Sequence, residues 1–247
     1  MDTRVVAASA LCATLYAVVG YMSYLGIFTP VIGVVRFWPS VFIPATFAII
    51  YGPMVGGLGA AIGIFISDML IHGNALLSLS VGVPANFIGF YTVGYLASKL
   101  KGKSSSVVWA LMVSAKLLCI ALVVYVASWI LKLISLGVAV AYIIGIAVSL
   151  AAVIAYSIVN RRTLYTPLIV FACSSGLLVG SVIIGIGVWL FSQYFILPGG
   201  GRALPVDAIL LWTLWVYVTE IPFMVWLTPI TVHIAMRMGL KTVLGAS

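Results

Sequence analysis

Apolar residues run through the chain in eight long segments that are separated by short polar stretches. A helix needs about 20 residues to cross a bilayer core of about 30 Å. Inside that core every backbone polar group must be hydrogen-bonded within the protein, so such runs are expected to be helices. The pattern predicts an all-α, polytopic transmembrane bundle with spans at about 5–27, 35–51, 54–72, 78–98, 106–131, 137–159, 166–196 and 206–233.

The second of these segments is short and interrupted by Pro39 and Pro44. Between the segments we find no polar linker long enough to separate two domains. We therefore expect residues 1–247 to form a single integral membrane domain.

The composition supports this class of protein. Charged residues make up 6% of the chain, whereas soluble domains carry about 25%. Mean hydropathy is +1.31. The formal net charge is +8, but the basic residues lie between the apolar runs and not along one face. This placement indicates topology and not nucleic-acid binding. We therefore expect a multi-pass protein of the plasma membrane that contacts lipid and not nucleic acid.

The placement of lysine and arginine predicts that both termini face the cytoplasm, because cytoplasmic loops carry an excess of these residues. With eight spans and the N-terminus inside, three basic residues fall outside: Arg36, Lys132 and Arg202. Eight fall inside: Arg4, Lys99, Lys101, Lys103, Arg161, Arg162, Arg237 and Lys241.

Small residues recur at four-residue spacing in several segments, which places them on one helix face and allows a second helix to approach closely. The third segment has a glycine series over 52–63, and packing within the bundle is the favoured interpretation of such a series. The first segment has Ser9, Ala13 and Ala17. Because this segment is the first of the chain, its stripe could also be offered to another subunit.

Three ionisable residues lie within the apolar segments: Asp68, Lys116 and Glu220. Such residues usually face the bundle interior or an aqueous cavity, because a charge at mid-bilayer costs at least about 2.5–3.5 kcal/mol. Lys116 and Glu220 reach a similar depth, so they are expected either to form a buried ion pair or to contact a polar ligand. Tyr217 shares a face with Glu220, beside the helix break expected at Pro222.

Asp68 and His72 are four residues apart and hence on one helix face. They are expected either to pair with each other or to converge with Arg36, Trp38 and Asn86 near the outer surface, where Asn74 also falls. We interpret this polar cluster as part of a binding pocket that opens outward.

Catalytic signals are weak. The chain has no phosphate-binding glycine–lysine motif, no paired metal-ligand spacing and no clear serine–histidine arrangement. An intramembrane enzyme that uses Asp68 and His72 is a minor alternative. If the protein drives active transport, another chain must hydrolyse the nucleotide.

The first hundred residues resemble the substrate-binding S components of energy-coupling-factor (ECF) transporters. The resemblance lies in three stretches: ATLYA at 13–17, PATFAIIYGPMVGGLGAAIGIFISDML at 44–70 and GVPANFIGFYTVGYL at 82–96. Members of that family usually have six spans, whereas eight are expected here, so the chain departs from the family's pattern in its remaining helices at 101–247.

The resemblance implies a membrane subunit that captures a vitamin or related micronutrient on the outer side. It would dock onto a T component that carries two cytoplasmic ATPases, so ATP would be hydrolysed by these partners, and the chain would bind no cofactor of its own. Ala13 and Ala17 would be the docking pair. The main alternative is a self-sufficient secondary transporter driven by protons or sodium, with Asp68 and Glu220 as the coupling carboxylates.

Overall fold

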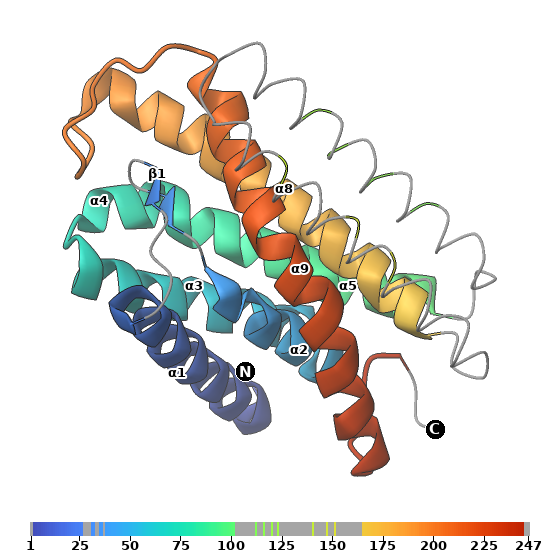
Figure 1. The fold of residues 1–247 in the computed structure, drawn as a ribbon. Coiled ribbons are helices and arrows are strands. Elements are labelled where there is room, and N and C mark those ends of the chain that lie inside the picture. The colour runs from blue at the N-terminus through green and yellow to red at the C-terminus, as the bar shows by residue number, and fades with distance from the viewer. Residues whose placement is uncertain are drawn as a thin grey trace.

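A computed structural model describes residues 2–26, 31–32, 35–36, 38–101 and 165–244, together with the single residues 112, 116, 120, 123, 140, 147 and 151. These parts of the chain are almost entirely helical (Figure 1). The expected spans at 106–131 and 137–159 lie outside the described residues, apart from these single positions.

Within the described parts of the chain, five helices are long and apolar enough to cross a membrane. Three are single elements: α1 (Thr3–Gly26), α3 (Pro53–Ile71) and α8 (Tyr165–Tyr194). The fourth is a continuous run of α4 (Ala75–Leu77), the π-helical segment η2 (Ser78–Gly82) and α5 (Val83–Leu100). The fifth is α9 (Ala208–Arg237). The prediction of a helical membrane protein is confirmed, whereas the number of eight spans and the orientation of the termini stay predictions.

The apolar segment at 35–51 does not form a long helix. Two-residue strands β1 (Val31–Ile32) and β2 (Val35–Arg36) pair antiparallel, and η1 (Pro39–Val41) leads into α2 (Phe42–Tyr51). The 10 residues of α2 extend only about 15 Å at 1.5 Å per residue, less than the bilayer core. Gly52, at a φ of 104°, and Pro53 end this helix and begin α3.

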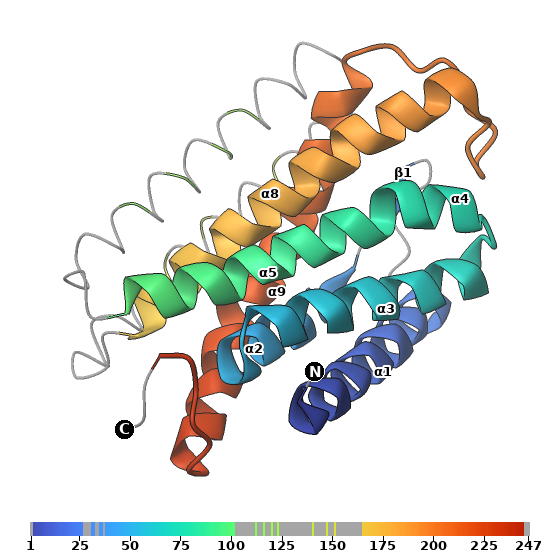
Figure 2. The same ribbon diagram turned by 180° about the vertical axis from the view of Figure 1, so that it is seen from behind.

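The long helices form a series of neighbours in the order α1, α3, α5, α8 and α9 (Figure 1; Figure 2). The short helix α2 packs against α1, α3, α5 and α9, and most of its side chains are buried. Because α2 touches both ends of the series, it holds α9 against the N-terminal half of the bundle. Near the C-terminus, the Val243 amide donates a hydrogen bond to the Ile49 carbonyl at 2.9 Å.

Glycines permit the closest of these helix contacts. A Cβ atom at Gly63 of α3 would lie 2.8 Å from the carbonyl oxygen of Ala13 on α1. Similarly, a Cβ atom at Gly176 of α8 would lie 2.6 Å from the carbonyl oxygen of Gly89 on α5. In both cases the obstacle is backbone, which cannot rotate away as a side chain can. The packing interpretation is therefore confirmed for Gly63, and also for Gly56 and Gly59, which approach Ala48 of α2 and Cys12 of α1. It does not hold for Gly52, which lies between α2 and α3 at a positive φ.

The small residues of α1 belong to the same contact. Ser9, Ala13 and Ala17 are buried, and α1 packs mainly against α3. The expectation that these residues face another subunit needs correction, because the glycine face of α3 already occupies that side of α1. The side of α1 that remains exposed carries other residues, among them Ala10, Leu11 and Thr14.

We expect Gly63→Leu to destabilise the protein by about 1–3 kcal/mol, the usual cost of overpacking. The added side chain collides with the backbone of α1, so the two helices must separate. Thermal unfolding of the purified protein in detergent measures the effect. Ile62→Leu, an exposed position on the same helix, is the control. Equal stability of both variants would contradict the close contact.

Candidate functional site

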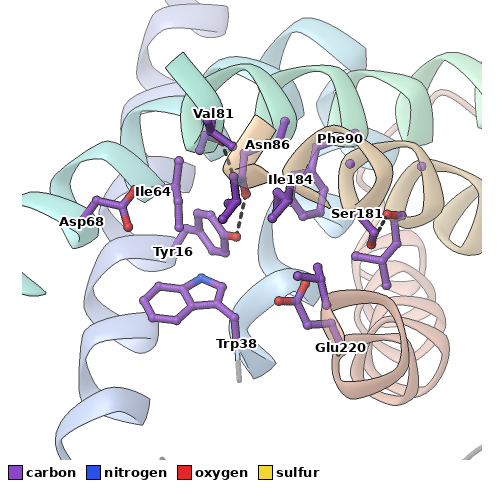
Figure 3. A pocket seen from close by; sticks show the side chains of 18 of the residues that line it. Tyr16, Trp38, Ile64, Asp68, Val81, Asn86, Phe90, Ser181, Ile184 and Glu220 are labelled. Carbon is purple, nitrogen blue, oxygen red and sulfur yellow. Dashed lines mark hydrogen bonds between the residues drawn. The ribbon is translucent and has the colours of Figure 1, made fainter. Parts of the chain in front are cut away.

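A cavity of about 110 Å³ lies among helices α1, α3, α5, α8 and α9, with η2 contributing to its wall (Figure 3). A water molecule needs roughly 10–15 Å³ by this kind of measure, so the space holds several waters or a small organic molecule. Most of its wall is apolar, with a few polar groups. This combination is typical of sites for small molecules.

Five of the residues predicted from the sequence as substrate-binding line this cavity: Trp38, Asp68, His72, Asn86 and Glu220. They come from four different places in the fold: the residue before η1, helix α3 with its C-cap, helix α5 and helix α9. Both alternatives are thus realised: Asp68 and His72 contact each other, and both line one cavity with Trp38 and Asn86. The side chain of Arg36 lies outside the described residues, and the roles of all these residues in binding stay predictions.

The Asp68 carboxylate is held by two neighbours. One oxygen, Oδ2, accepts a hydrogen bond from the Ser78 hydroxyl at 2.7 Å, and the other, Oδ1, lies 3.4 Å from Nε2 of His72. A Cβ atom at Gly82 would lie 2.9 Å from Oδ2, so this glycine leaves room for the carboxylate. Asp68 is only 5% exposed, and these contacts offset part of the cost of its burial.

The arrangement around Asp68 does not resemble a catalytic triad. Nδ1 of His72 accepts a hydrogen bond from the Asn74 amide at 3.0 Å, so the proton of a neutral ring resides on Nε2, which faces Asp68. In a triad the imidazole lies between the hydroxyl and the carboxylate. Here the carboxylate lies between Ser78 and His72, so the imidazole contacts the carboxylate and not the serine hydroxyl. Ser67 donates instead to the Gly63 carbonyl at 2.9 Å.

Tyr16 of α1 is a lining residue that the sequence reasoning missed. Its hydroxyl donates a hydrogen bond to Oδ1 of Asn86 at 2.8 Å, and the Asn86 amide donates to the Gly82 carbonyl at 2.9 Å. Its ring makes edge contacts with Trp38 and Phe90, at centroid distances of 6.2 and 6.0 Å. A tyrosine at the end of a small-residue series was the available signal, because a buried phenol needs a hydrogen-bond partner.

The π-helical segment η2 was also not foreseen. The Val83 amide donates to the Ser78 carbonyl, a bond across five residues that widens the helix locally. Such segments are frequent at functional sites. Pro84 has no amide hydrogen, which leaves the Ser80 carbonyl without its usual partner and favours the wider turn. In this segment Val81 and Gly82 line the cavity, and Ser78 contacts Asp68.

Glu220 enters the cavity from the opposite side. In Figure 3 its side chain lies on one side of Tyr16 and Trp38, and Asp68 lies on the other. It is 6% exposed. Within the described part of the chain, no hydrogen bond or ion pair reaches its carboxyl group. Pro222 follows two residues later inside α9 and leaves the Val218 carbonyl without an intrahelical donor.

Three predicted residues do not line the cavity: Asn74, Tyr217 and Lys116. The Asn74 side chain caps α4 by accepting from the Leu77 amide at 3.0 Å, and Tyr217 is buried in the hydrophobic core. Lys116 donates to the Ser175 hydroxyl at 2.6 Å and lies 4.4 Å from the centre of the Phe171 ring. The ion pair with Glu220, one of the two alternatives for Lys116, is therefore replaced by contacts with α8. Arg36 belongs to β2, and its side chain lies outside the described parts.

Comparison of the chain with protein-family models, with curated proteins and with solved structures finds no match. The functional proposal therefore rests on the arrangement of residues around the cavity.

We expect Ser78→Ala to destabilise the protein by about 1–3 kcal/mol, because it removes a hydrogen bond from a buried carboxylate. Ser80→Ala is a matched control, since the Ser80 hydroxyl contacts only backbone carbonyls and is exposed. Denaturant unfolding of both variants in detergent provides the comparison. Ser78→Ala with wild-type stability would show that Asp68 does not depend on this contact.

Proposed function

We propose that the chain is the membrane-embedded substrate-binding subunit of an ECF-type transporter and captures a vitamin or related small micronutrient. The observation that carries this proposal is the cavity: a small space with convergent polar side chains, lined by helices that expose large apolar side chains elsewhere. The resemblance of the first hundred residues to S components agrees with it.

Binding accounts for the site better than catalysis does. Ser78, Asp68 and His72 are arranged in an order in which the imidazole contacts the carboxylate and not the serine hydroxyl, unlike a catalytic triad. The described residues contain no group of three or more metal-binding side chains. What remains at the cavity is hydrogen-bonding and aromatic recognition, from Asn86, Tyr16, Trp38 and Phe90.

Uptake against a gradient would require partners. The sequence has no phosphate-binding loop, so ATP would be hydrolysed by the ATPases that accompany a T component. Since Ser9, Ala13 and Ala17 are buried against α3, we place the docking surface on the exposed side of α1. Ala10 lies there beside the buried stripe, and a small residue at this position would allow a helix of the T component to approach closely.

A second candidate is a secondary transporter that couples solute movement to protons or sodium. Glu220 favours it, because an ionisable group buried within membrane helices is typical of ion-coupling sites. In this case the chain alone would move its solute.

We expect the purified protein to retain a small solute that Ile184→Trp expels. Ile184 lines the cavity, and an indole there fills the space. Mass spectrometry of the copurified solutes should show at least a tenfold loss. Ile186→Trp is the matched control, because it places the same side chain on the exposed side of the same helix. Retention of solute by Ile184→Trp would remove the cavity from consideration as the binding site.

We expect Ala10→Trp to leave solute binding intact and to abolish copurification with the T component and ATPases encoded in the same genome. The bulky ring holds the partner helix away from α1, while the cavity is unchanged. Ile186→Trp should copurify as the wild type does. Solute transport by the chain alone, reconstituted in liposomes without partners, would favour the secondary transporter instead.

A further inference from the structure

The charge of the cavity lining indicates what kind of solute it takes. Asp68 and Glu220 both line it, and none of the described lining residues is lysine or arginine. His72 brings no fixed positive charge, because its Nδ1 accepts a hydrogen bond from the Asn74 amide. The described wall is therefore neutral or negative, and it contains no cationic group to receive an anion.

The two carboxyl groups differ in their surroundings. Asp68 is engaged by the Ser78 hydroxyl and by His72. Glu220 is equally buried but has no hydrogen-bond or ion-pair partner among the described residues. Leaving a buried polar group unsatisfied costs about 1–3 kcal/mol, and more for a charged group. A cationic ligand group would remove this cost, because it supplies both a donor and an opposite charge.

Aromatic side chains occupy the space between the two acids. Tyr16 lies in edge contact with Trp38 and with Phe90, and all three line the cavity. Figure 3 shows Tyr16 and Trp38 between Asp68 on one side and Glu220 on the other. Aromatic rings bind flat apolar rings, and their faces also attract cations. Val216, Ile184 and Ser181 also line the cavity, and the Ser181 hydroxyl donates a hydrogen bond to the Leu177 carbonyl of its own helix at 2.7 Å.

We infer that the solute is a small organic cation with an aromatic ring, whose positive group lies against Glu220 and whose ring lies against Tyr16, Trp38 and Phe90. This inference rests on the proposed binding function and assigns a substrate class to the same cavity. Glu220 is then the residue that selects for charge. Asp68 already has Ser78 and His72 as partners. Its role is to hold these two parts of the cavity wall together and to add to the negative potential of the cavity.

Three probes of similar size but different charge test which charge the cavity prefers. They are benzylamine, which is cationic at neutral pH, benzyl alcohol, which is neutral, and benzoate, which is anionic. Their binding to the purified full-length protein in detergent is followed by tryptophan fluorescence, since Trp38 lines the cavity. We expect benzylamine to bind at least tenfold more tightly than either of the others. In Glu220→Gln, which keeps the size and polarity of the side chain, this preference should disappear while benzyl alcohol binds as before.

Asp207→Asn is the matched control. It also removes one negative charge from α9, but Asp207 is the exposed residue before the first turn of this helix, and asparagine serves equally well there. This variant should keep the full preference for benzylamine.

The inference is overturned if benzoate binds as tightly as benzylamine, if benzylamine does not bind, or if Glu220→Gln keeps the preference. A different result would identify an ion-coupling site instead. In that case sodium chloride, but not benzylamine, stabilises the protein against unfolding, and this effect is lost in Glu220→Gln. None of these results decides the proposed function. That function is tested separately, by identifying the solute that copurifies with the wild-type protein and is lost in Ile184→Trp. An anionic copurified solute would uphold binding and reject the cationic class.

Discussion

Apolar helices gain little free energy by associating in lipid, because lipid chains are as apolar as the side chains they replace. Dispersion and close packing between the helices must then hold the bundle together. In this protein the packing depends on glycines that bring backbones into contact, at Gly63 against Ala13 and at Gly176 against Gly89. These two contacts set the distances between α1 and α3 and between α5 and α8.

The same contacts determine where the polar side chains meet. With its glycine face against α1, helix α3 presents Asp68 to η2 and the cavity. On α1, Tyr16 lies next to the buried small residues and reaches Asn86 of α5. The cavity is thus formed by helices that are held close on one side and separated by aromatic side chains on the other. Its polar groups lie inside a bundle whose outer surface remains apolar.

The cavity also illustrates how a membrane protein accommodates acids. Asp68 is stabilised locally, by a serine one helical segment away and by a histidine four residues away. Glu220 has no such neighbours among the described residues. A buried acid without a partner is costly for folding, and the cationic ligand proposed above would offset this cost. The physical distinction between the two acids supports assigning one to structure and the other to recognition.

The sequence by itself determined the class of protein, the positions of most long helices, and the choice of Asp68, His72, Asn86 and Glu220 as candidate pocket residues, which line the cavity. These properties follow from local features: hydropathy, periodicity and the rarity of charge in apolar segments. It did not reveal that Ser9, Ala13 and Ala17 face α3, that Asn74 caps a helix, or that Lys116 contacts Ser175. Only the tertiary structure decided these points, because a helical period places residues on a face without saying which neighbour covers that face. For the same reason, the meeting of Tyr16 with Asn86, 70 positions apart, became visible only when the helices were packed.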